Sequence, residues 1–234
     1  DGYPRTEDQG RELGERLEGH GAALDAVVEL VADPDVVVER PRKRATEQGK
    51  TIREVTDPVA SVFHEDRKYL RIADAEHYPR ATAYIPQMIA LVERLVRNGV
   101  AYQAEDGSVY FAIRKFEGYG KLSRLDTREL QAGARVAQDD YSKENAQDFA
   151  LWKSAKPEDE ACGAAWDSPW GRGRPGWHLE CSAMAMTILG ETLDLHTGGI
   201  DLIFPHHEDE IAQSEAATGL PFVGTWLHCA HLQM

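Results

Sequence analysis

The sequence predicts an α/β fold built around a parallel sheet, and three observations support this prediction. Apolar runs of strand length alternate with segments of helical periodicity along most of the chain. A glycine-containing turn, "HTGGID" at residues 196–201, directly follows one of the apolar runs. Hydrophobic residues make up 42% of the 234 residues, which is enough for one sizeable domain or two small ones. In such sheets ligands bind at the carboxyl ends of the strands.

The first 49 residues predict a helix, a strand and the start of a second helix. Residues 6–21 form an amphipathic pattern that begins at a threonine cap and ends on glycine. Residues 24–32, "LDAVVELVA", are a β-branched run typical of a buried strand. A second helix would begin near Pro34. Pro41 would interrupt it, because proline lacks an amide hydrogen and costs ~3 kcal/mol inside a helix.

From Lys50 onward the pattern changes. Helices are expected over residues 56–72 and 80–99, the second closed by Gly99. Residues 100–113, "VAYQAEDGSVYFAI", predict a hairpin, because two strand-like runs flank an Asp-Gly turn. After a polar connector, "DFALWK" at residues 148–153 predicts another strand.

The last third alternates loop, helix and strand. Residues 168–190 read as a Gly/Pro-rich loop that leads into a helix, and residues 191–199 as a strand with a turn. A further helix is expected over residues 204–219, and a last strand from residue 222 onward.

Composition narrows the class of protein. The net charge is −14, from 40 acidic and 26 basic residues, which argues against a dedicated nucleic-acid coat but leaves room for a local basic groove. The three cysteines have no disulfide-framework spacing, so a cytoplasmic location is expected. No apolar run approaches the ~20 residues of a membrane span, so no membrane partner is expected. Because the first residue is Asp, the chain is expected to be a piece of a longer protein.

A metal site is suggested by the segment "PHHEDE" at residues 205–210. His206 and Glu210 are four residues apart, which places them on one face of a helix. An imidazole, a carboxylate and the thiolate of Cys181 would supply three ligands of a tetrahedral zinc site, with Cys229 or His231 as the fourth on spacing alone. The alternative is an ordinary helix start with acids in its first turn and a buried core cysteine. The spacing alone leaves both interpretations open.

Longer motifs resemble a known family. "SPWGRGRPGWHLECSAMAMTILG", "DLHTGGIDLIFPHHEDEIAQSEAATG" and "WLHCAH", together with "YGKLSRLD", "AGARV" and "DFALWK", resemble the cysteinyl-tRNA synthetases of class I. The resemblance covers residues 50–234 in order. It implies a Rossmann-like catalytic domain that is incomplete, because its first strand and signature motif are missing. A connective α+β region is expected to be inserted in this domain at about residues 100–150.

The resemblance also implies a ligand set. The family holds zinc with two cysteines, a histidine and a glutamate, and three of these match Cys181, His206 and Glu210. The remaining cysteine belongs to a stretch that the sequence does not contain. In the family the zinc binds the substrate thiolate. Because a thiolate binds zinc better than a hydroxyl does, the enzyme discriminates cysteine from serine without an editing site.

A cysteine pocket follows from the same comparison. Trp177 matches the tryptophan that closes over the amino acid, and His196 and Asp201 match positions around the pocket. Asp201 is expected to pair with the substrate ammonium. His207 and Glu208 are expected to support the metal ligands rather than to bind the metal.

The implied reaction is the ATP-dependent ligation of L-cysteine to tRNA(Cys) through cysteinyl-adenylate. None of the nine histidines lies in a His-Ile-Gly-His motif, and the Lys-Met-Ser-Lys-Ser motif is expected downstream of "WLHCAHL". We therefore expect the chain alone to be inactive. The cysteine ligase of mycothiol biosynthesis is a related alternative, but it lacks the acid at the position of Glu210, so "HHEDEIAQSEA" favours the synthetase.

Residues 1–49 resemble an internal segment of adenylate kinase instead. By that match Arg5 would contact an AMP phosphate, and Arg40 and Arg44 would reach ATP phosphates. The alternative is that these arginines are only exposed basic residues, because the glycine-rich phosphate loop of the kinase is missing. Two other functions therefore stay open for the chain: nucleotide binding by residues 1–49, and a non-catalytic zinc- or thiol-binding module.

Overall fold

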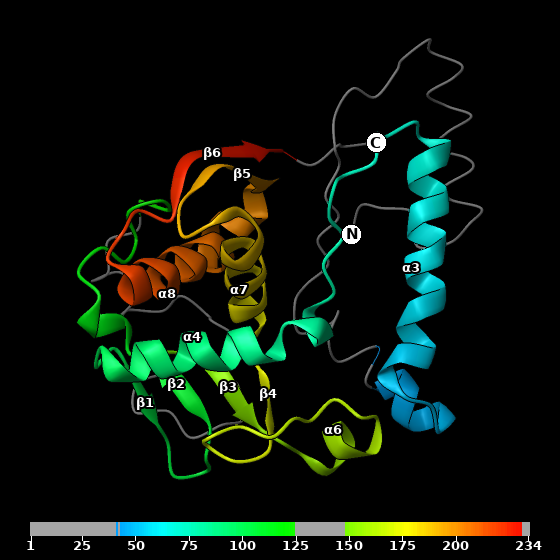
Figure 1. Cartoon of the computed structure of the whole chain (residues 1–234), viewed down its shortest axis with the longest axis horizontal. Coiled ribbons are helices and arrows are strands. Elements are labelled where there is room, and N and C mark those ends of the chain that lie inside the picture. The colour runs from blue at the N-terminus through cyan, green and yellow to red at the C-terminus, as the bar shows by residue number, and fades with distance from the viewer. Residues whose placement is uncertain (1–40, 42, 125–147, 231–234) are drawn as a thin grey trace. The chain divides into compact units, whose positions relative to one another are not determined.

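A computed structural model describes residue 41, residues 43–124 and residues 148–230 (Figure 1). The described chain divides into two compact units. The first contains the described residues up to Tyr78 with Ala161–Gly163 and Ala230, and the second contains Pro79–Glu160 and Ala164–Cys229. Arg5, Arg40 and the strand predicted at residues 24–32 lie outside the described residues. Arg44 is exposed on a helical stretch at residues 43–48. The kinase-like role of these arginines therefore stays a prediction.

In the first unit, helix α3 (Ile52–Tyr69) confirms the helix expected over residues 56–72 and places its start earlier. Thr51 and Glu54 form a reciprocal capping box: Thr51 Oγ1 accepts from the Glu54 amide at 3.3 Å, and Glu54 Oε2 accepts from the Thr51 amide at 2.8 Å. At the other end the buried Arg67 donates to the carbonyls of Ile72 and Ala73 at 3.0 and 2.8 Å. These contacts fix both ends of the helix.

Thr51→Ala is expected to destabilise the first turn of α3 by about 1 kcal/mol, because the Glu54 amide loses its acceptor and the Glu54 carboxylate loses the Thr51 hydroxyl. Hydrogen exchange of the amides at residues 52–55 should become about fivefold faster. Thr56→Ala is the matched control, because its hydroxyl donates to the Ile52 carbonyl within the helix. Equal acceleration in both variants would contradict the capping role.

The second unit contains a four-stranded antiparallel sheet in the order β1-β2-β3-β4. Its strands are β1 (Ala101–Gln103), β2 (Val109–Phe111), β3 (Phe149–Ser154) and β4 (Gly173–Pro175). The hairpin predicted at residues 100–113 is confirmed, with Gly107 at φ 87° in its turn. The strand predicted at residues 148–153 is confirmed as β3. Strand β4 was not predicted, because it lies inside the Gly/Pro-rich loop.

A second sheet pairs β5 (Leu193–Gly199) with β6 (Val223–Cys229) in parallel. Both strands confirm the sequence prediction. The parallel arrangement expected for the whole sheet holds, among the described strands, for this pair only, since β1 to β4 are antiparallel.

Three helices pack together beside the sheets: α4 (Ile85–Arg97), α7 (Trp177–Leu189) and α8 (Glu208–Thr218) (Figure 1). Shorter helical segments are η1 (Ala81–Ala83), η2 (Ile113–Lys115), α6 (Pro157–Ala161) and η3 (Ile200–Leu202). The core between α4, α7, α8 and the antiparallel sheet includes Met88, Leu95, Phe111, Trp152 and Leu179. Within the described ranges, no helix combines the length and apolar character that a membrane crossing requires.

The entry into α8 differs from the sequence prediction. Regular helix begins at Glu208, and a wider helical turn, η4 (Ile203–His207), precedes it. Phe204 leaves helical geometry within this turn, at φ −138° and ψ 133°. His206 follows Phe204 and lies in η4, directly before α8, so the expectation that His206 and Glu210 occupy one helical face stays a prediction.

Candidate functional site

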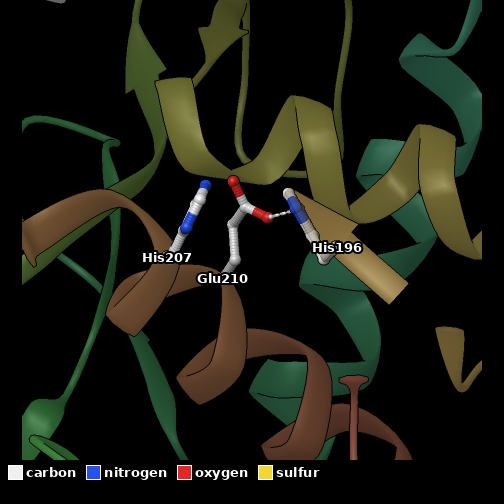
Figure 2. Close-up of side chains that lie close together, drawn as sticks. All are labelled: His196, His207 and Glu210. Atoms are coloured by element: carbon white, nitrogen blue, oxygen red, sulfur yellow. Dashed lines mark hydrogen bonds and ion pairs between the residues drawn. The ribbon is translucent and has the colours of Figure 1, made fainter. Parts of the chain in front are cut away.

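Glu210 lies between two imidazoles at the start of α8 (Figure 2). Its Oε2 is 2.9 Å from His196 Nε2, and the Glu210 side chain is almost fully buried. His196, His207 and Glu210 each offer one ligand atom, and these atoms all lie within 4.8 Å of one another. His196 comes from β5 and the other two from the segment that follows it, so the group gathers beside the parallel pair of strands.

Burial shifts the pKa values of His207 and Glu210 toward the neutral form of each side chain. Burial lowers the pKa of His207 to about 3, and the neighbouring His196 and His228 add to this shift. Burial raises the pKa of Glu210, against the opposing effect of its hydrogen bond to His196. A buried neutral imidazole has a lone pair to offer, and a buried carboxylate gains from a nearby positive charge. Zinc prefers such nitrogen and oxygen donors.

Two aromatic side chains of strand β6, Trp226 and His228, contact the histidines beside Glu210. His207 Nδ1 is 2.8 Å from His228 Nε2, and Trp226 stacks on His196 with 4.6 Å between ring centroids. Neither Trp226 nor His228 is assigned a role from the sequence. The sequence signal for both residues is the alternation of side chains along a strand, which places Trp226 and His228 on the same face. In the parallel pairing of β5 with β6, Trp226 lies opposite His196.

The remaining predicted ligands lie on neighbouring elements. His206 is buried, 6.5 Å from Trp177 between ring centroids, so one predicted ligand and one predicted pocket residue are neighbours. Cys181 is exposed on α7, and burial raises the pKa of the preceding residue, Glu180, to about 7. Neither Cys181 nor His206 belongs to the group that the described residues form around Glu210. The set Cys181, His206 and Glu210 therefore stays a prediction.

Two further expectations concern the rim of this region. Asp201 lies on η3, directly after β5, and its side chain is exposed. It is therefore accessible to a ligand from solution. Cys229 is exposed at the end of β6, and His231 lies outside the described residues. A fourth ligand is therefore not assigned.

Comparison with known proteins identifies the family. The family model of the class I (C) tRNA synthetase catalytic domain matches residues 28–234. Proteins named cysteine--tRNA ligase are similar: that of Paraburkholderia xenovorans is 55% identical over 192 residues, covering 82% of this chain and 41% of the relative. That of Chlamydia pneumoniae is 52% identical over 188 residues, covering 80% and 40%. That of an Acidovorax species is 51% identical over 212 residues, covering 91% and 45%.

The chain thus spans less than half the length of these relatives. The family match begins at residue 28, before the position near Lys50 where the resemblance was expected to start. The boundary at residue 49 and the kinase-like segment before it remain predictions. The family model and the high identity agree on the remainder, and the chain therefore belongs to the cysteinyl-tRNA synthetase family of class I.

Proposed function

We propose that this chain forms the cysteine-binding part of a cytoplasmic cysteine--tRNA ligase and holds zinc there. The observation that carries the proposal is the buried carboxylate of Glu210, which His196 holds by a hydrogen bond of 2.9 Å in a chain of this family. In the whole protein, L-cysteine, ATP and tRNA(Cys) would be the substrates, with cysteinyl-adenylate as the intermediate.

The donors present fit zinc. We assign the metal to Cys181, His206 and Glu210, the set that the family resemblance implies, while His196 orients Glu210 through the bond at 2.9 Å. When bound, zinc would supply a soft Lewis-acid position for the substrate sulfur, which a serine hydroxyl fills poorly. Trp177, beside His206, would exclude water from that position, and Asp201 would accept a hydrogen bond from the substrate ammonium.

Cobalt binding to the full chain tests the site, because a thiolate ligand gives Co²⁺ a near-ultraviolet charge-transfer band. Glu210→Gln should weaken binding at least ~10-fold, and Cys181→Ser should remove the band and weaken binding similarly. His207→Asn, the matched control, should change affinity less. If His207→Asn weakens binding and Cys181→Ser does not, the ligands are His196, His207 and Glu210. A wild-type chain that binds no metal would contradict the proposal.

Measuring substrate binding distinguishes a ligase fragment from a module that binds only the metal. The zinc-loaded chain should bind L-cysteine and not L-serine in calorimetry, and Asp201→Asn should weaken cysteine binding. Because the chain has no His-Ile-Gly-His motif, we expect no cysteine-dependent exchange of pyrophosphate into ATP. Zinc binding with no preference for cysteine would favour the non-catalytic module.

A further inference from the structure

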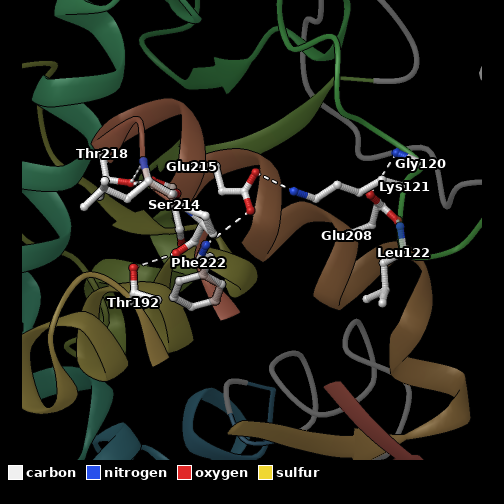
Figure 3. A network of polar contacts seen from close by, with 11 residues as sticks. Gly120, Lys121, Leu122, Thr192, Glu208, Ser214, Glu215, Thr218 and Phe222 are labelled. Carbon is white, nitrogen blue, oxygen red and sulfur yellow. Dashed lines mark hydrogen bonds and ion pairs between the residues drawn. The ribbon is translucent and has the colours of Figure 1, made fainter. Parts of the chain in front are cut away.

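Glu208 is a fully buried acid whose partners lie on a distant segment. Its Oε1 accepts from the amide of Gly120 at 2.8 Å, and its Oε2 accepts from the amide of Leu122 at 3.1 Å (Figure 3). The same Oε2 also accepts from the amide of Ser123 at 2.8 Å. An acid in the first turn of a helix ordinarily favours the dipole of its own helix. Here both oxygens are engaged by the backbone of another segment, which we call loop 119–123.

The contact has the character of a built anion site. Several backbone N–H groups that converge on one point bind anions, and bonds to a charged acceptor are stronger than neutral ones. In this structure the protein's own carboxylate occupies that point. Lys121 adds a second attachment of the same loop to α8, through a 2.5 Å ion pair with Glu215, whose other oxygen accepts from the Phe222 amide at 3.2 Å.

The next acid, Asp209, holds the same loop and a neighbouring helix. It accepts from the Tyr119 hydroxyl at 2.5 Å, and lies 3.1 Å from His178 Nε2 on α7. Burial raises the pKa of Tyr119 and holds the pKa of His178 well below its usual value, so the first is a neutral donor and the second a neutral imidazole. Three successive acids therefore reach three different elements: Glu208 the loop, Asp209 the loop and α7, and Glu210 strand β5.

We propose that Glu208 is a positioning residue, which binds loop 119–123 and thereby fixes the first turn of α8 that carries Glu210. Glu208 and Glu210 lie in the same helical turn, and the residues of one turn move together. If the turn moves because its bonds to the loop amides change, the Glu210 carboxylate moves with it. Metal ligands must lie within about 0.2 Å of their ideal distances, so a small shift matters. The metal consequence rests on the proposed function, whereas the positioning itself does not.

The first experiment needs no metal. In the full chain, ¹⁵N NMR of the His196 ring reports its bond to Glu210, and amide exchange reports the loop. Glu208→Gln keeps the size of the side chain but removes the charge; it should alter the His196 signal and speed exchange at Gly120 and Ser123 about tenfold. Glu215→Gln, the same change on the same helix, should leave the His196 signal unchanged. An unaltered His196 signal in Glu208→Gln, or an equal change in both variants, would overturn the proposal.

Cobalt affinity gives the second arm. Glu208→Gln should weaken binding 10- to 100-fold, Glu215→Gln should leave it unchanged, and Glu208→Asp should lie between. If the wild-type chain binds no metal, the proposed function fails while the NMR arm still decides the positioning role. If Glu208→Gln does not fold, Glu208→Asp is compared with Glu215→Asp by the same NMR measurements. A change at His196 without faster loop exchange would overturn the proposal there.

Discussion

Gly198→Ala is expected to displace the His207 ring and to destabilise the second unit by about 1 to 3 kcal/mol. A Cβ at Gly198 would lie 2.6 Å from Cε1 and 3.1 Å from Nε2 of His207. The ring is buried and its Nδ1 is 2.8 Å from His228 Nε2, so it has little freedom to turn away. The new methyl group must therefore break this hydrogen bond or push strand β5 outward.

Urea denaturation measures the loss of stability, and ¹⁵N NMR of His207 and His228 measures the loss of their hydrogen bond. Gly219→Ala is the control, because its φ of 75° costs an alanine about 1 to 2 kcal/mol while no atom lies within 4 Å of the new Cβ. The control should lose stability and keep the histidine signals. Unchanged histidine signals in Gly198→Ala would show that the strand, and not the ring, absorbs the methyl group.

Local signals made much of the fold predictable. The Asp106-Gly107 pair specified the hairpin, because Gly107 adopts a positive φ that its turn requires. The β-branched and apolar runs specified β3, β5 and β6, and the first four side chains of β3 are buried. Strand β4 was not predicted, because its three residues lie in a Gly/Pro-rich segment without a strand pattern of their own. They form a strand through pairing with β3.

The candidate site was predictable in part. Glu210 and His196 were both named from the sequence, and the structure joins them by a hydrogen bond. The shared helix face expected for His206 and Glu210 stays a prediction, because His206 lies in the wider turn η4 that precedes α8. The role of Glu208 depends on loop amides 85 to 88 residues away, and no local periodicity reports such a partner.

Gly176→Ala is expected to have the largest effect on the fold, a loss of more than about 4 kcal/mol or a failure to fold. A Cβ at Gly176 would lie 1.8 Å from the Ala150 carbonyl oxygen and 2.7 Å from its carbon. Both atoms belong to the backbone of β3, the strand that pairs with β2 and β4. A flexible side chain could move aside, but this backbone cannot shift without breaking those pairings.

The position of Gly176 extends the effect to the candidate site. It is the cap between β4 and α7, and its amide donates to the Leu151 carbonyl at 2.8 Å. Helix α7 carries Trp177 and Cys181, so separating Gly176 from β3 would displace both residues. Gly99→Ala is the control: its φ is 74° and no atom lies within 4 Å of the new Cβ, so it should cost only about 1 to 2 kcal/mol. Gly176 itself has an extended backbone with φ −70°, so alanine meets no backbone strain there. Equal losses of stability in the two variants, measured by urea denaturation, would therefore contradict the expected clash with β3.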